Sequence, residues 1–114
     1  MAVTNLAELI SDGIRISVGE TPPTTTVYLG SSGVLVSELQ FLLDYIAEFY
    51  NEITPVLRTS RFTNDTKTGV IDFQKNFGLT PDGIVGPATW EKLYSVYHSI
   101  VNTVVIPMLT QQYY

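Results

Sequence analysis

The spacing of hydrophobic residues predicts a long amphipathic helix over residues 34–50. Apolar positions recur at alternating steps of three and four residues, so their side chains share one face of a helix. These positions are Val36, Leu39, Leu43, Ile46 and Tyr50. The acidic residues of the segment lie mostly outside that face. The segment is therefore expected to bury one side and to expose the other to solvent.

Two further helices follow at similar spacing. One is predicted to begin at Thr63 or Asn64, either of which can cap a helix, and to end before Gly78. The other is predicted to begin at Gly86-Pro87 and to be stopped by Pro107, because proline fits the first turn of a helix and interrupts its interior. Three helices with facing apolar stripes predict an all-α fold, a small orthogonal three-helix bundle with an N-terminal extended arm.

The arm precedes the first long helix. Residues 4–11 favour a short helix, residues 14–18 alternate apolar and polar side chains as a strand does, and Thr21–Thr26 is an extended connector with two prolines. The chain is therefore divided into an arm or linker over 1–28, a domain over 29–106 and a C-terminal tail over 107–114.

The two later segments resemble each other as an internal repeat. Thr66 lies 23 residues before Thr89, and Val70 lies the same distance before Leu93. Each segment has the order loop, threonine, helix. The chain is therefore interpreted as two related loop–helix units that follow the helix at 34–50.

Composition excludes several classes of protein. The chain has 114 residues, 45% hydrophobic and 15% charged, which is typical of one folded domain. Its net charge is −5 without a basic stripe, so nucleic acid and membrane surfaces are not expected partners. The apolar stretch Ile100–Leu109 is too short to span a bilayer, and residues 1–10 lack the basic segment of a signal peptide. No cysteine is present, which excludes disulfides and thiolate metal sites.

Candidate catalytic and metal-binding groups are few. His98 is the only histidine and has neither a second histidine nor a cysteine with which to bind a metal. Asp44 and Glu48 lie one turn apart on the polar side of one helix, whereas glycoside hydrolysis needs two carboxyl groups across a cleft. The serines have no recognisable base beside them. The chain is expected to have no metal, no cofactor and no catalytic activity.

Two motifs resemble the bacterial peptidoglycan-binding domain. Residues 70–89 are similar to that family's pattern V-x-x-F-Q-x-x-x-G-L-x-x-D-G-x-x-G-x-x-T, and residues 30–40 are similar to its opening G-x-x-G-x-x-V-x-x-L-Q. The resemblance covers about residues 29–97. The whole chain looks most like one unit of the tandem modules of spore-forming Gram-positive bacteria. It implies a helical bundle that binds the glycan or the stem peptide of the cell wall and accompanies a hydrolase.

The resemblance implies a groove beside the loop at 82–89, bordered by the start of the third helix and by the loop at 58–64. Gly83 and Gly86 are expected to permit a tight turn whose N–H groups point outward, and Thr89 to bond the loop backbone. Gln40 and Gln74 are expected to brace loop carbonyls from inside the bundle. The candidate ligand-binding residues are Asp82, Gly83, Ile84, Gly86, Pro87, Thr89, Tyr94, Arg58, Arg61 and Asn64.

The aromatic residues divide into core and surface candidates. Phe73 and Trp90 are expected in the core, together with Tyr50 and Tyr97, by their helical spacing. Exposed tyrosine rings suit sugars, since they combine an apolar face with a hydroxyl group. The better candidates for such rings are Tyr45 and Tyr94.

One loop departs from the family pattern. Where the family often has Asp-Gly in the first unit, this chain has Thr59-Ser60, and Thr63 replaces a later glycine. The loop is therefore predicted to follow a different backbone path, which puts glycan binding there in question. Arg58 and Arg61 remain able to meet a stem-peptide carboxylate.

Alternative functions remain open. A degenerate module with a structural or protein-interaction role would keep the fold without binding glycan, and a wall-lytic enzyme would need a catalytic constellation. The apolar residues of 100–114 are also able to pair with residues 5–18, within one chain or between neighbouring modules of a longer one. Cell-wall or extracellular localisation follows from the resemblance, while spore-associated or cytoplasmic localisation is an alternative.

Overall fold

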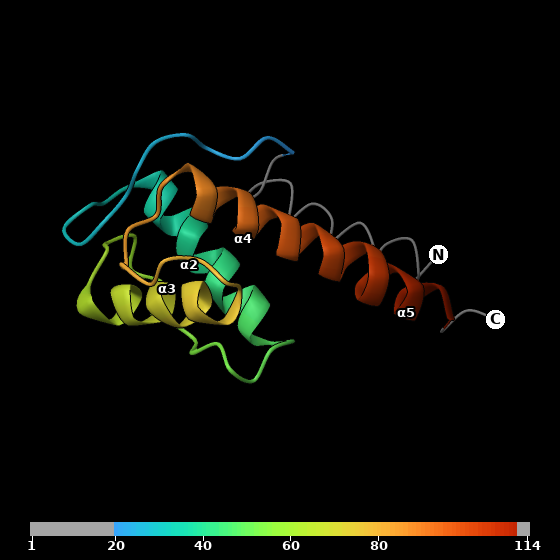
Figure 1. Ribbon diagram of the computed structural model, residues 1–114. Coiled ribbons are helices and arrows are strands. Elements are labelled where there is room, and N and C mark those ends of the chain that lie inside the picture. The colour runs from blue at the N-terminus through green and yellow to red at the C-terminus, as the bar shows by residue number, and fades with distance from the viewer. Residues whose placement is uncertain (1–19, 112–114) are drawn as a thin grey trace.

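The chain folds as a three-helix bundle. The computed structural model describes residues 20–111, without the side chains of 109–111. Helix α2 spans Val34–Ala47, α3 spans Asn64–Asn76 and α4 spans Pro87–Ile100 (Figure 1). Over residues 20–111 the chain has only isolated bridges, Val27 with Val85 and Ser32 with Arg61, in place of strands. The predicted all-α fold is confirmed.

The helices α3 and α4 begin where the sequence predicts. Thr63 caps α3, with its side chain accepting a hydrogen bond from the Thr66 N–H, and Asp65 lies in the first turn, where the helix dipole favours a negative charge. Helix α4 begins with Pro87, whose missing N–H is not needed in a first turn.

Helix α2 ends at Ala47, three residues earlier than predicted. Its last turn tightens, because the N–H groups of Glu48 and Phe49 bond carbonyls only three residues earlier. The chain then turns so that Ile53 enters the core, at 2% exposure, while Tyr50 is 37% exposed. The prediction that Tyr50 is a core residue is therefore wrong.

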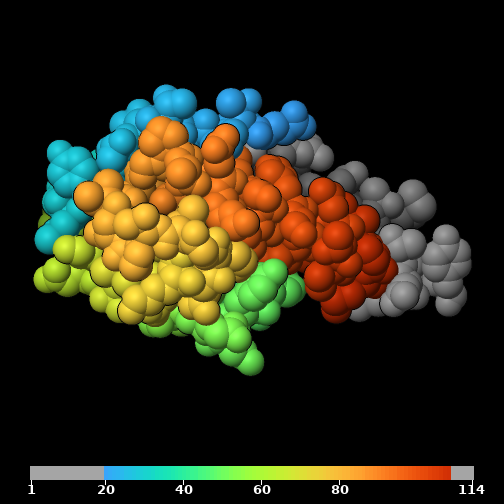
Figure 2. Space-filling model, viewed as in Figure 1, coloured from blue at the N-terminus to red at the C-terminus, as the bar shows by residue number. Residues whose placement is uncertain are grey.

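The core lies between the three helices and includes the end of the N-terminal segment. Phe73, Trp90 and Tyr97 are fully buried, as predicted. The Trp90 indole N–H donates to the Thr25 carbonyl at 2.8 Å, and Val27 is buried while pairing with Val85. In Figure 2 the residues from 20 onward accordingly lie across the start of α4.

The third helix does not stop at Pro107, and the prediction that it does is wrong. A π-helix, Val101–Val105, continues α4, and α5 follows over Ile106–Gln111 (Figure 1). The Ile106 N–H bonds the Val101 carbonyl, five residues earlier. This wider turn shifts the hydrogen-bond register, so that Pro107 falls in the first turn of α5, where a proline is tolerated.

Several predictions concern residues outside the described part of the chain. The short helix at 4–11, the strand at 14–18 and the pairing of 5–18 with the C-terminal segment lie there, at least in part. The boundaries 1–28, 29–106 and 107–114 remain predictions. Among residues 20–111, no helix combines the length and apolar character that crossing a bilayer would require.

Candidate functional site

A buried glutamine on α2 holds the loop that precedes α3. The Gln40 side-chain oxygen accepts hydrogen bonds from the N–H groups of Thr59, at 3.0 Å, and Ser60, at 2.9 Å. Its amide nitrogen donates to the Arg61 carbonyl at 2.9 Å and to the Thr66 hydroxyl at 3.1 Å. Gln40 is fully buried, so these bonds are shielded from competition with water.

A second buried glutamine holds the loop that precedes α4 in the same way. The Gln74 side-chain oxygen accepts from the Gly83 N–H at 2.9 Å. Its amide nitrogen donates to the Ile84 carbonyl at 2.9 Å, to Asp82 Oδ1 at 3.0 Å and to the Thr89 hydroxyl at 3.2 Å. The prediction that both glutamines brace loop carbonyls from inside the bundle is confirmed.

The two loops share one backbone path. Ser60 has φ +63° and Gly83 has φ +75°, so both lie in the left-handed region. Ser60 donates its N–H to Gln40, and Gly83 donates its N–H to Gln74. Each buried glutamine, with its hydrogen bonds to the loop, is called a glutamine clamp below. The prediction that the first loop follows a different path is wrong, because hydrogen bonds from Gln40 and Ser37 of α2 hold Ser60 in a conformation that glycine adopts more readily.

The side chains beside these two residues are also equivalent. The Thr59 hydroxyl accepts from the Arg61 N–H at 3.2 Å, and Asp82 Oδ1 accepts from the Ile84 N–H at 2.9 Å. A threonine in the first loop therefore does what an aspartate does in the second. The predicted internal repeat of 23 residues therefore corresponds to the two loops, which have equivalent hydrogen bonds at equivalent positions.

Three expectations for the second loop need correction. The Gly83 N–H points inward to Gln74 and not outward. Gly86 has φ −96°, which any residue can adopt, so only Gly83 requires the freedom of glycine. The hydrogen bond of the Thr89 hydroxyl is accepted from the Gln74 amide and does not come from the loop backbone.

A groove of about 470 Å³ lies beside the second loop. It brings together five of the residues predicted to bind ligand, namely Asp82, Ile84, Gly86, Pro87 and Thr89. Ile84 is 44% exposed at its rim. Arg61 of the first loop and Asn64, the first residue of α3, do not line this groove.

Tyr94 does not present an exposed ring, contrary to prediction. It is 4% exposed, and its hydroxyl donates to Glu38 Oε2 at 2.5 Å. Tyr45 is partly buried and contacts Tyr97, with ring centroids 5.1 Å apart. The apolar stripe of α4 is wide enough to bury Tyr94, because α2 covers that side of the helix.

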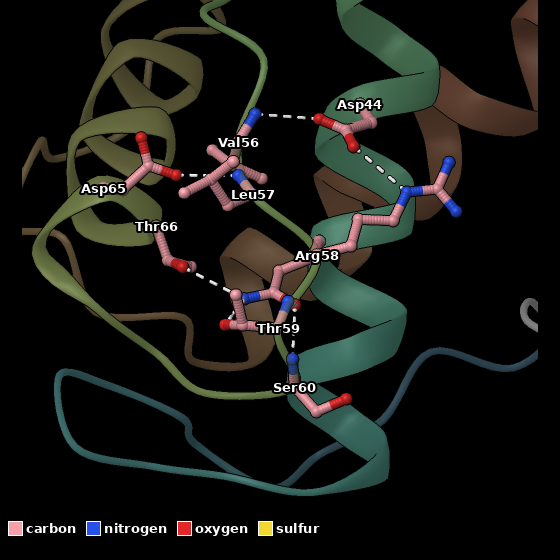
Figure 3. Close-up of polar contacts among 9 residues, drawn as sticks. Asp44, Val56, Leu57, Arg58, Thr59, Ser60, Asp65 and Thr66 are labelled. Carbon is pink, nitrogen blue, oxygen red and sulfur yellow. Dashed lines mark hydrogen bonds and ion pairs between the residues drawn. The ribbon is translucent and has the colours of Figure 1, made fainter.

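The segment before the first loop is held by side chains from two helices (Figure 3). Asp44 on α2 accepts from the Val56 N–H at 2.8 Å, and Asp65 on α3 accepts from the Leu57 N–H at 2.7 Å. Asp44 also accepts from Arg58 Nε at 3.0 Å. Asp44, considered above as a catalytic carboxylate, thus positions this segment.

A second groove, of about 390 Å³, lies between α2 and this segment. Arg58 and Ser60 line one side, and Glu38 and Phe41 of α2 line the other. Burial raises the pKa of Glu38, and the Tyr94 hydrogen bond lowers it by less. Sequence reasoning included Arg58 but missed Glu38 and Phe41. The sequence could have indicated them, because residues three apart on a helix are neighbours on its surface and both lie on the more polar side of α2.

The described residues show no metal centre. Residues 20–111 contain no group of three or more His, Cys, Asp or Glu side chains able to hold a metal ion. His98 packs edge-on against the rings of Tyr94 and Tyr97.

The chain is similar to known proteins. A zinc D-Ala-D-Ala carboxypeptidase from Streptomyces albus G is 37% identical over 71 residues, which are 62% of this chain and 27% of that enzyme. A crystal structure of a peptidoglycan-binding protein from Clostridioides difficile, in complex with glutamine hydroxamate, matches with 37% identity and a TM-score of 0.51. That match covers 61% of this chain and 40% of the other.

The chain thus spans about a quarter of the carboxypeptidase and two fifths of the Clostridioides difficile protein. The family model of the peptidoglycan-binding domain matches residues 32–93, which contain α2, α3, the first half of α4 and both glutamine clamps. The chain belongs to the peptidoglycan-binding domain family.

Proposed function

We propose that this domain binds peptidoglycan without catalysing a reaction on it, and that it anchors or targets a longer protein to the cell wall. The observation that carries the proposal is the pair of loops held by Gln40 and Gln74. The buried Gln40 side chain makes at least three hydrogen bonds to the first loop, and the buried Gln74 side chain makes three to the second. A preformed site does not lose loop entropy when it binds.

The groove beside the second loop is the proposed contact for the wall. Ile84 offers an apolar surface at its rim, and Thr80 adds an exposed hydroxyl group. Pro87 is exposed on the first turn of α4. This mixture of apolar and hydroxyl groups suits the faces of sugar rings and the methyl groups of a stem peptide.

Binding by one domain is expected to be weak. The groove is open, and a net charge of −5 does not attract an acidic cell wall over long range. Several such modules on one chain would strengthen retention through their effective concentration. Cell-wall or extracellular localisation of the parent protein forms part of this proposal.

A pull-down on insoluble peptidoglycan tests the proposal. The purified domain should be retained, and Ile84→Ser should reduce retention severalfold, because it removes an exposed apolar contact at the rim. Met108→Ser is a matched control, since Met108 is 56% exposed on α5, away from the groove. Circular dichroism should show that both variants are as helical as the wild type.

The alternative is a structural or protein-interaction module of the same fold. The net charge of −5 favours this alternative, because a positively charged domain would be attracted to an acidic cell wall and this domain is not. If the folded wild-type domain is not retained at low or moderate salt, this alternative replaces the wall-binding proposal. If both variants are retained as well as the wild type, wall binding stands and the groove beside Ile84 is not the contact.

A further inference from the structure

The groove between α2 and residues 58–60 contains two opposite charges that do not pair with each other. Arg58 and Glu38 both line it, yet the ion pair that Arg58 forms in the described part of the chain is with Asp44. Opposite charges in one groove usually approach each other unless other contacts hold them. Both side chains here are held, and the space between them is open.

Arg58 is oriented by two contacts. Its Nε donates to Asp44 at 3.0 Å, and its guanidinium carbon lies 5.2 Å from the centre of the Phe41 ring. In Figure 3 the two terminal nitrogens point away from Asp44. The side chain is 56% exposed, so the terminal N–H groups remain available to a ligand. A guanidinium held in this way presents a fork that matches a carboxylate.

Glu38 is held from the opposite side of the groove. The Tyr94 hydroxyl donates to its Oε2, and Oε1 has no hydrogen bond to the residues that the structure describes. Burial makes the charged form of this carboxylate costly, as the direction of its pKa shift indicates. A cation placed beside Oε1 would offset that cost.

The groove also has an apolar part. Val34 is 83% exposed at the start of α2, and Phe41, which follows Glu38 by three residues on α2, also lines the groove. Such a surface suits the methylene groups of a flexible side chain. The hydroxyl groups of Ser37 and Ser60 bond each other at the edge of the groove.

We propose that this groove binds a stem-peptide residue whose side chain ends in an ammonium and a carboxylate group on one carbon, as diaminopimelate does. The carboxylate binds the Arg58 fork, the ammonium binds Glu38, and the methylene groups lie on Phe41. The inference rests on the proposed function, since it names the part of peptidoglycan that one groove selects.

The test is a nuclear magnetic resonance titration of the ¹⁵N-labelled domain with two soluble stem tripeptides. One ends in diaminopimelate, and the other ends in lysine, which carries the side-chain ammonium without its carboxylate. The diaminopimelate peptide is expected to bind about tenfold more tightly, as one charge-assisted contact allows. The Arg58 Nε–H and the Ser60 N–H signals should shift.

Three variants separate the contributions. Arg58→Gln should abolish the preference for diaminopimelate while leaving the affinity for the lysine peptide unchanged. Glu38→Gln should weaken both peptides similarly, and its amide oxygen can still accept from Tyr94. Lys75→Gln is the control, because Lys75 is an exposed cation outside both grooves. The dispersion of each spectrum shows whether the variant is folded.

Equal affinities of the wild type for the two peptides, or shifts confined to residues 80–89, would overturn this assignment. Retention on insoluble peptidoglycan without any response to soluble peptides would also overturn it, while the proposed function would stand. If the domain neither responds to the peptides nor is retained on the wall, both proposals fail.

Discussion

Ser60 and Gly83 occupy equivalent positions in two loops and have nearly the same left-handed backbone, with φ of +63° and +75°. Each donates its N–H to the side-chain oxygen of a buried glutamine, at 2.9 Å in both loops. An L-residue in this region costs roughly 1–2 kcal/mol relative to a right-handed conformation, whereas glycine adopts it freely. The first loop is therefore strained where the second is not.

Relief of this strain should stabilise the protein. Ser60→Gly is expected to raise the free energy of unfolding by about 0.5–1 kcal/mol, because the gain exceeds the loss of an exposed hydroxyl contact with Ser37. Urea denaturation followed by circular dichroism measures the change. Ser60→Ala is the matched control, since it removes the same hydroxyl but keeps the Cβ. A Ser60→Gly variant no more stable than Ser60→Ala would contradict the prediction.

The opposite substitution in the second loop should be harmful. A Cβ at Gly83 would lie 2.9 Å from Cγ and Cε of Lys67, and its φ is unfavourable for alanine. Lys67 can move, so backbone strain dominates, and Gly83→Ala is expected to cost about 1–2 kcal/mol. Gly86→Ala is the control, because a Cβ there meets its nearest atom at 3.9 Å. Equal melting temperatures of the two variants would argue against a strained loop.

The glutamine clamps should be essential to the fold. Gln74→Leu keeps much of the side-chain volume but leaves the Gly83 N–H and the Ile84 carbonyl without their partner. The expected cost is about 3 kcal/mol, since each buried group left unsatisfied costs about 1–3 kcal/mol. Gln40→Leu should behave alike, because its clamp is equivalent. Denaturation midpoints within a few tenths molar of the wild type would show that water replaces the clamp.

The buried Tyr97 hydroxyl should contribute nothing to stability. Its oxygen has no hydrogen-bond partner among the residues that the structure describes, and burial, followed by the influence of Tyr45, raises its pKa. Tyr97→Phe should therefore unfold at the same temperature as the wild type or at a higher one. Differential scanning calorimetry decides this. A loss of more than about 1 kcal/mol would reveal a partner for the hydroxyl.

Glu38 should make stability depend on pH. Its folded pKa is raised above 4.5, mainly by burial, so the folded state prefers the protonated form. Between pH about 4.5 and the folded pKa, the carboxyl has lost its proton in the unfolded state but keeps it in the folded state. The free energy of unfolding therefore falls as pH rises through this range. Glu38→Gln, which does not ionise, should lack this fall.

The gain in melting temperature from Glu38→Gln should therefore grow from pH 4 to pH 7. Glu91→Gln is the comparison, since Glu91 is exposed on α4. A difference between Glu38→Gln and the wild type that stays constant over this range would contradict a raised pKa.

The starts of the helices and the role of the two glutamines followed from the sequence by itself. Helix spacing depends on side chains close together in the chain, and the cap at Thr63 and the proline at Pro87 are local signals. Gln40 and Gln74 could also be assigned, since a buried amide must find partners and the nearest unpaired backbone groups belong to the loops.

Tertiary structure alone decided the path of the first loop and the surface on which the two grooves lie. Ser60 has a left-handed backbone because its hydrogen bond to Gln40 outweighs the preference of serine for negative φ. The residues next to Ser60 in the sequence do not indicate this long-range contact. Tyr94 is buried and Tyr50 exposed, against their spacing, because periodicity defines a face of a helix but not how far a neighbouring element covers it. The groove of Arg58 and Glu38 exists because two segments distant in sequence meet, and only the fold brings them together.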